Sequence, residues 1–323
     1  RAAPGEFVFG HAVKKVVVTI GAVALLSASS SNAQPYPSKP IRILTSAPGN
    51  SDELAARLIS QGISGGLGQQ AVVDNRGVVA VEIAAKSPPD GYTLLLYGSP
   101  MWLAPFMRDR LPYDPVKDFA PVTWATNSPN LLVVHPSLPV KSVRELVALA
   151  KAKPGAINYA SGGAGTATFI AAELFTGPAG IQLLHVPYRA GGEALTSVLS
   201  GETSVYFAPL ATALPHVRQN RLRALAVTST KRVGLLPELP TVAELGYRGY
   251  QSGNWYGILL PARTPREIVT SLHGQTVKAL ATPALNKRLV DLGYISIGDT
   301  PEEFAAHIRA EIASLAKVLR DLN

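Results

Sequence analysis

The chain has 323 residues, of which 47% are hydrophobic, so it is long enough for two domain-sized cores and too apolar to be disordered. It contains no cysteine, which excludes disulfides, thiolate metal sites and a cysteine nucleophile. The formal charge of +8 is modest, and the basic residues occur in pairs and triplets without interleaved aromatic residues. We therefore expect no nucleic-acid partner.

Residues 1–33 have the features of a secretory signal peptide preceded by a few upstream residues. Lys14 and Lys15 precede an apolar run over 16–26, and Ser31-Asn32-Ala33 is an A-x-A-like cleavage site before Gln34. The run is shorter than the roughly 20 apolar residues that a membrane-spanning helix needs, and no later segment reaches that length. We therefore expect this segment to be removed on export.

The segment after Gln34 predicts strands and helices in the order βαβαβ. This order favours a parallel sheet with right-handed crossovers, whose ligand crevice lies at the carboxyl ends of the strands. That rule places the turns at 46–51 and 97–101 around the crevice. The strands are expected at 41–45, 71–74 and 92–97.

Two acidic residues begin the first predicted helix. Asn50 is the expected N-cap, and Glu53 then falls where its carboxylate can bond back to the cap in a capping box. The alternative is that Asp52 and Glu53 meet an amine of a ligand, since carboxylates at this position compete with an anion.

A proline-rich passage over 111–139, with a strand expected at 131–135, marks a crossing into a second domain. A capping box at Ser142 to Glu145 opens a helix there, and a second βαβαβ order follows. The strands of this second set are expected at 157–160, 183–186 and 204–207. Strands at 222–228 and 253–260 then carry the chain back.

Three further helices are each announced by a Thr-Pro pair, with threonine as the cap and proline at the first helical position. They contain no convergent polar residues, so we expect them to pack on the first domain. The pairs are Thr264-Pro265, Thr282-Pro283 and Thr300-Pro301.

The stretch from Ile157 to Phe175 predicts a strand, a glycine-rich turn and a helix that begins near Thr166. Glycines at 162, 163 and 165 let the backbone approach a ligand closely and adopt positive φ. The free N–H groups of the first helical turn form an anion site. An ordinary connection between a strand and a helix explains the same pattern.

The sequence shows no catalytic or metal-binding constellation. The six histidines lack H-x-x-x-H spacing, and no G-x-S-x-G elbow, P-loop or dinucleotide fingerprint is present. Ser161 has no base identifiable from the sequence, so a secreted hydrolase that uses it is kept as an alternative. N–H groups, hydroxyls and Arg189 together suit a carboxylate, although a solvated Arg189 is the alternative.

A set of short motifs runs in order along nearly the whole chain after residue 34. They are YPSKPIR at 36–42, PPDGYTLLL at 88–96, LPYDPVKDFAPV at 111–122, NYASGG at 158–163, HVPY at 185–188, LRALAVT at 222–228 and PTVAE at 240–244. Taken together, these motifs resemble the Bug family of extracytoplasmic solute receptors, the binding components of tripartite tricarboxylate transporters.

The resemblance implies a periplasmic-binding-protein fold of the α/β class, with two lobes that are each a mainly parallel sheet flanked by helices. Lobe 1 would comprise 34–126 and 253–323, and lobe 2 would comprise 127–252, with a hinge between them. A monomer in the periplasm would close on a small carboxylated solute and deliver it to a membrane permease, without catalysis, cofactor or metal. A sensor that signals to a membrane partner is an alternative.

In this family the turn after the first strand and the strand–turn–helix of the second lobe supply most ligand contacts. The ligand-binding residues predicted here are Ser46, Ala47, Pro48, Gly49, Asn50, Ser51, Tyr97, Ser99, Ser161, Gly162, Gly163, Gly165, Thr166, Tyr188, Arg189 and Ala208.

The chain departs from the family pattern at three places, and all three concern the ligand. The family's Pro-Gly-Gly-x-x-Asp appears as residues 48–53 with Asn50 in place of a glycine and Glu53 in place of the aspartate. The glycine-rich segment after Arg76 is shortened to 77–79, and Phe169 stands where a histidine is common.

Overall fold

The computed structural model describes residues 36–106 and 110–321, and Lys39–Asn323 forms one folded unit. The predicted signal peptide lies outside the described residues. None of the helices in the described part of the chain is long and apolar enough to cross a membrane.

The first predicted βαβαβ order is confirmed. Strand β1 (Ile41–Thr45) lies between β2 (Ala71–Asn75) and β3 (Thr93–Tyr97) and is parallel to both. Ile41, Ile43 and Leu44 of β1 are fully buried, as expected for a central strand covered on both faces. The connections are α2 (Ser51–Leu67), η1 (Gly77–Val79) and α3 (Ala80–Ala85), and α4 (Pro100–Leu103) and η2 (Ala104–Phe106) follow β3.

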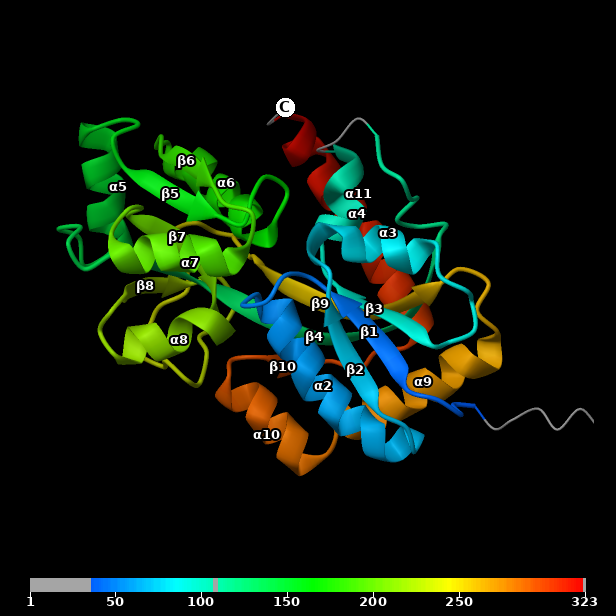
Figure 1. Cartoon of the computed structure of the whole chain (residues 1–323). Coiled ribbons are helices and arrows are strands. Elements are labelled where there is room, and N and C mark those ends of the chain that lie inside the picture. The colour runs from blue at the N-terminus through cyan, green and yellow to red at the C-terminus, as the bar shows by residue number, and fades with distance from the viewer. Residues whose placement is uncertain (1–35, 107–109, 322–323) are drawn as a thin grey trace, which may run out of the picture. The chain divides into compact units, whose positions relative to one another are not determined.

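The second βαβαβ order is also confirmed, with β5 (Asn158–Ser161) between and parallel to β6 (Leu184–Pro187) and β7 (Val205–Pro209). Figure 1 shows this group apart from β1, β2 and β3. Its helices are α5 (Val143–Ala152), α6 (Ala167–Ala179), α7 (Gly191–Ser200) and α8 (Leu210–Arg218). The capping box of α5 forms in part, since Ser142 Oγ accepts from the N–H of Glu145 at 3.2 Å and Glu145 bonds back to the N–H of Lys141 at 2.7 Å.

Two long strands run between these groups (Figure 1). Strand β4 (Phe119–Val134) pairs antiparallel with β9 (Gly253–Pro261) as far as Pro129, and from Asn130 it pairs with β7 and with β8 (Arg223–Val227). The sheet order is therefore β2-β1-β3-β9-β4-β7-β5-β6, with β8 and β10 (Ile295–Ser296) also paired to β4.

The prediction of a strand only at 131–135 was wrong, because β4 begins at Phe119 and contains prolines. Pro121 lies next to a shift in the pairing register with β9, and Pro129 lies where the partner strand changes. Proline lacks the N–H that a regular ladder needs, and both positions tolerate that loss. The lobe boundaries at 126/127 and 252/253 stay predictions.

The three C-terminal helices are α9 (Arg266–Leu280), α10 (Pro283–Asp291) and α11 (Pro301–Asp321). Helix α9 contacts α2 and β4, α10 contacts α2, and α11 contacts β4 and α4, so the three helices pack against elements that precede the second βαβαβ group. The predicted threonine cap forms only at α11, where Thr300 Oγ1 accepts from the N–H of Glu303 at 3.2 Å. The hydroxyls of Thr264 and Thr282 instead donate to preceding carbonyl groups, and Pro265 itself is the N-cap of α9.

Candidate functional site

A cavity of about 740 Å³ opens at the carboxyl ends of the parallel strands. Segments that directly follow β1, β2, β3, β5 and β6 line it, together with residues of β7 and β9. A cavity therefore lies at the carboxyl ends of β1 and β3, where the crevice is predicted, and it extends to the carboxyl ends of β5 and β6 in the second group. No group of His, Asp or Glu suited to hold a metal ion occurs in the described part of the chain.

Most of the predicted site residues line this one cavity. They are Ser46, Ala47, Gly49, Asn50, Ser51, Tyr97, Ser99, Gly162, Gly163, Gly165, Thr166, Tyr188 and Arg189. Three do not: Pro48 is exposed, Ser161 is fully buried, and Ala208 is buried in β7 opposite Leu131.

Several lining residues were not predicted from the sequence. They include Asp52, Arg76, Val78, Val81, Tyr113, Thr168, Gly191, Tyr206, Asn254, Trp255 and Tyr256. The carboxyl-end rule, applied to β2 as it was to β1, would have indicated Arg76 and Val78. The sequence analysis predicts 254–256 only as part of a strand that carries the chain back. The polar and aromatic residues within this apolar strand are the sequence feature that could have indicated a contribution to the cavity.

Asn50 connects the turn after β1 to the start of α7. It is the N-cap of α2 by backbone geometry, yet its side chain makes no cap bond. Its Nδ2 donates to Ser46 Oγ at 2.8 Å, and its Oδ1 accepts from the N–H of Gly191 at 2.9 Å. A Cβ on Gly191 would lie 3.2 Å from that oxygen, so this close approach favours glycine. The predicted capping box with Glu53 was wrong.

The two acidic residues at the start of α2 lie in different environments, and only one of them lines the cavity. Glu53 pairs with Arg57, one turn along the helix, and does not line the cavity. Asp52 lines the cavity but is only 7% exposed, and it has no ion-pair partner among the described residues. Of the two acids that the sequence left as capping or amine-binding groups, only Asp52 is placed to meet a ligand.

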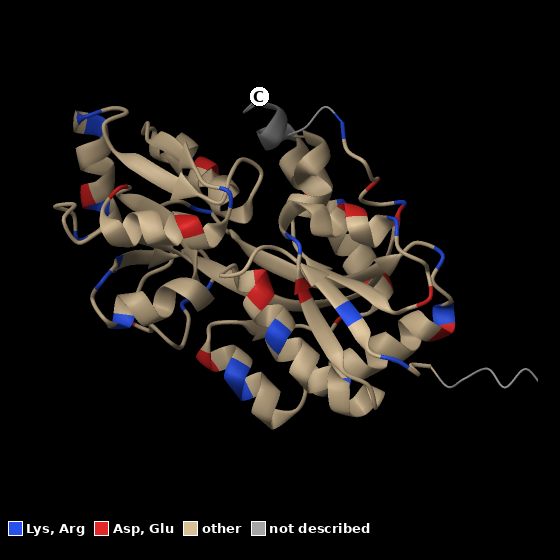
Figure 2. Ribbon diagram, viewed as in Figure 1, with Lys and Arg blue, Asp and Glu red and all other residues tan. Residues whose placement is uncertain are grey.

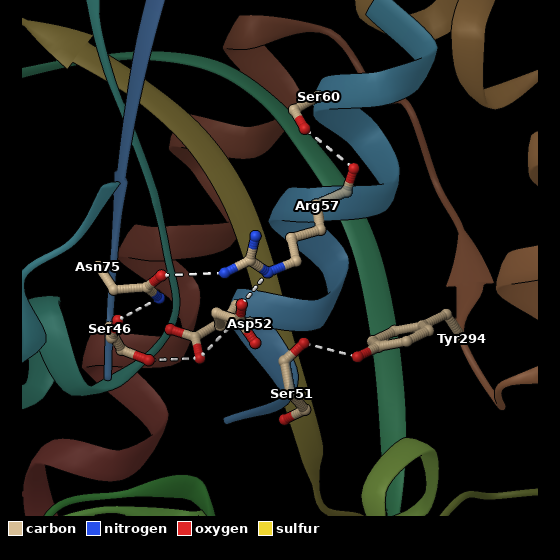
Figure 3. Close-up of polar contacts among 8 residues, drawn as sticks. Ser46, Ser51, Asp52, Arg57, Ser60, Asn75 and Tyr294 are labelled. Carbon is tan, nitrogen blue, oxygen red and sulfur yellow. Dashed lines mark hydrogen bonds and ion pairs between the residues drawn. The ribbon is translucent and has the colours of Figure 1, made fainter. Parts of the chain in front are cut away.

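Asp52 is held by short hydrogen bonds (Figure 3). Its Oδ1 accepts from Ser46 Oγ at 2.6 Å and from the N–H of Glu53 at 3.0 Å. Burial nevertheless raises the pKa of Asp52 to about 6, because loss of solvent penalises the carboxylate more than these bonds stabilise it.

Two tyrosines form hydrogen bonds to Ser51 in the first turn of α2. Tyr256 of β9 hydrogen bonds to Ser51 Oγ, and Tyr294 donates to the carbonyl of Ser51 at 2.5 Å, as Figure 3 shows for Tyr294. Burial raises the pKa of both tyrosines well above 10, with the charge of Asp52 adding to the shift, so both stay neutral.

The glycine-rich turn after β5 forms the opposite wall. Gly163 has φ +105°, a conformation that side chains disfavour, and Thr166 caps α6 by accepting from the N–H of Phe169 at 3.4 Å. Within the described residues, the N–H groups of Ala164 and Gly165 have no protein partner, and both residues line the cavity. These groups suit an anion.

Tyr188 and Arg189 follow β6 on the same wall. The hydroxyl of Tyr188 is buried and has no hydrogen-bond partner in the described part of the chain. Arg189 is exposed and forms no ion pair with any described residue, whereas Arg76 of the cavity mouth is paired with Asp74 at 2.8 Å. Figure 2 shows that the other basic residues are spread over many elements rather than gathered in one stripe.

Ser161 has a base after all. Its Oγ lies 2.7 Å from His185 Nε2 on β6, the strand paired with β5. His185 stacks on Tyr159 at 4.8 Å and packs against Phe169, and burial lowers its pKa, which favours the neutral ring in this hydrogen bond. Since Ser161 is fully buried and does not line the cavity, this pair joins two strands and is not placed to attack a solute.

Ser99, which lines the cavity, is hydrogen bonded to a residue of α11. It donates to Glu311 of α11 at 2.7 Å, and Trp102 donates to the same carboxylate at 2.8 Å. Burial raises the pKa of Glu311. The expectation that the C-terminal helices bring no polar residue toward the site was therefore wrong for α11.

Comparison with known proteins identifies the family. Residues 55–323 match the family described as tripartite tricarboxylate transporter family receptor. The chain belongs to this family. BugT of Bordetella pertussis is 32% identical, over 94% of this chain and 94% of its own.

Two solved structures show the same fold. Rpa4515 of R. palustris, determined with adipate, has a TM-score of 0.85 and 32% identity, over 88% of this chain and 97% of that one. MatC from Rhodopseudomonas palustris, with bound malate, has a TM-score of 0.82 and 27% identity, over 88% of this chain and 100% of that one. The resemblance drawn from the motifs and the two-lobed periplasmic-binding fold are thereby confirmed.

Proposed function

We propose that the chain captures a small carboxylated solute in the cavity and delivers it to the membrane permease of a tripartite tricarboxylate-type transporter. The relatives determined with adipate and malate support a carboxylate. The observation that carries the proposal is the turn after β5, where Ala164 and Gly165 line the cavity and their N–H groups have no protein partner among the described residues.

The proposal also includes the cellular location, the oligomeric state and the absence of catalysis. The chain is exported by its N-terminal segment, acts in the periplasm as a monomer, and performs no catalytic step. The burial of Ser161 outside the cavity lining argues against the hydrolase alternative. The predicted residues that do line the cavity are proposed as its ligand contacts.

The donors after β6 provide the test. Tyr188→Phe removes only a hydroxyl that has no hydrogen-bond partner among the described residues, and Arg189→Ala removes a cation that forms no ion pair with any of them. Each should weaken binding of a carboxylate by about 1–3 kcal/mol if it donates to a charged group. The measurement is a titration of purified protein stripped of solute by unfolding and refolding.

Arg248→Ala is the matched control, because Arg248 is exposed and does not line the cavity. Its affinity should equal that of the unmodified protein. If both Tyr188→Phe and Arg189→Ala retained full affinity, or if no carboxylate bound at all, the proposed site would be wrong.

A further inference from the structure

The cavity has one acidic wall and one donor wall. Among the described residues, Asp52 is the only acid that lines it, and it comes from the start of α2. The free N–H groups of Ala164 and Gly165, together with Tyr188 and Arg189, lie in the turns after β5 and β6. A solute that bridges these walls meets an acceptor at one end and donors at the other.

Among the residues that the structure describes, Asp52 also has no counter-ion. Two arginines close to Asp52 in the sequence or in the cavity lining pair with other acids. Arg57 pairs with Glu53, and Arg76, which lines the cavity, pairs with Asp74. The groups that hydrogen bond to the Asp52 carboxylate are the hydroxyl of Ser46 and the backbone N–H groups of Ser46, Asp52 and Glu53, which are all neutral donors. A charge that is buried without a partner is costly, and a cation brought by the solute would remove that cost.

A second carboxylate at this position would have the opposite effect. It would face Asp52 inside a low-dielectric cavity, where like charges repel more strongly than in water. The two hydroxyls nearby, on Tyr256 and Tyr294, are already engaged with Ser51 and offer no compensating positive charge. The donor wall can hold one carboxylate, and the acidic wall disfavours another.

We propose that Asp52 binds a positively charged group of the solute, so that the cavity selects an ammonium carboxylate over a dicarboxylate of the same length. This inference rests on the proposed function, because it assumes that the other end of the solute is a carboxylate held by the turns after β5 and β6.

The test compares solutes that differ only in one end group. Binding of 6-aminohexanoate and adipate, and of 5-aminopentanoate and glutarate, is measured by calorimetry at pH 7.5 on stripped protein. The unmodified protein should bind the amino member of at least one pair tenfold or more tightly. Asp52→Asn should abolish or invert that ratio, because asparagine keeps an oxygen for the bond from Ser46 but loses the charge.

Glu53→Gln is the matched control, because it removes the neighbouring charge, which lies outside the cavity lining, and it should leave the ratio unchanged. The thermal midpoint of each variant shows that it is folded. A preference for dicarboxylates, or a ratio that Asp52→Asn leaves intact, would overturn the inference while the proposed function stands. Failure of all four solutes, and of malate, to bind would instead count against both proposals.

Discussion

Burial raises the pKa of Asp52 to about 6 from its ordinary value of 3.8. Between these values the folded protein holds a proton that the unfolded chain has released, so the contribution of Asp52 to the free energy of unfolding is greatest below pH 4 and falls as the pH rises through 6. The shift corresponds to at most about 3 kcal/mol lost at neutral pH. Burial also raises the pKa of Asp299 and Glu311, which add to the same slope.

Comparison with Asp52→Asn isolates the contribution of this residue. In the absence of solute, the variant should be more stable than the unmodified protein by about 1–3 kcal/mol at pH 7.5, and the difference should vanish near pH 4. Urea unfolding at the two pH values measures it. A difference that does not change with pH would show that Asp52 is not buried as a carboxylate beside Ser46, Tyr256 and Tyr294.

At the scale of single residues, the sequence could predict that an acid stands at the start of α2 but not which one faces the ligand. Asp52 and Glu53 are adjacent on a helix and therefore point in different directions. Which of them meets the cavity depends on the rotation of α2 about its axis, and that is set by packing of Tyr256 and Tyr294 against Ser51. Those residues lie more than 200 positions away in the sequence.

At the scale of elements, Asn50 joins the turn after β1 to α7 across the mouth of the cavity. Asn50→Gly removes the bonds to Ser46 Oγ and to the N–H of Gly191. Each bond contributes about 1 kcal/mol at most, so we expect bound solute to dissociate roughly 5–30 times faster.

Stopped-flow displacement of bound solute measures that rate. The association rate should change little, because the bond to Gly191 forms only when the turn after β1 and α7 approach each other. An unchanged dissociation rate would show that this contact does not hold the two elements together.

Local sequence patterns predicted which segments form helices and strands, but they did not predict strand pairing between segments far apart in the sequence. Periodicity and turn residues predicted both βαβαβ groups because each strand and helix is specified within a few residues. Strand β4 was shortened in the prediction because Pro121 and Pro129 break the local pattern, and only pairing with β9 and β7 shows that they are tolerated. The partner of Ser161, His185, likewise appears only once β5 and β6 are paired.

At the scale of the whole molecule, the chain is a member of a receptor family, and its two α/β groups share one cavity. The carboxyl-end rule predicted where this cavity lies, because it follows from strand order alone, and the motif resemblance indicated the same turns. The contributions of Asp52 and the 254–256 run depended on side-chain directions, which strand order leaves open.

The most direct test of this account is a calorimetric titration of the stripped protein with amino carboxylates and dicarboxylates of four to six carbons. We predict saturable binding of one solute per chain, with the midpoint of thermal unfolding rising as the solute concentration increases. Two results would contradict the claim that this cavity captures a carboxylated solute. One is that no carboxylate binds, and the other is that Tyr188→Phe and Arg189→Ala leave the affinity for the bound carboxylate unchanged.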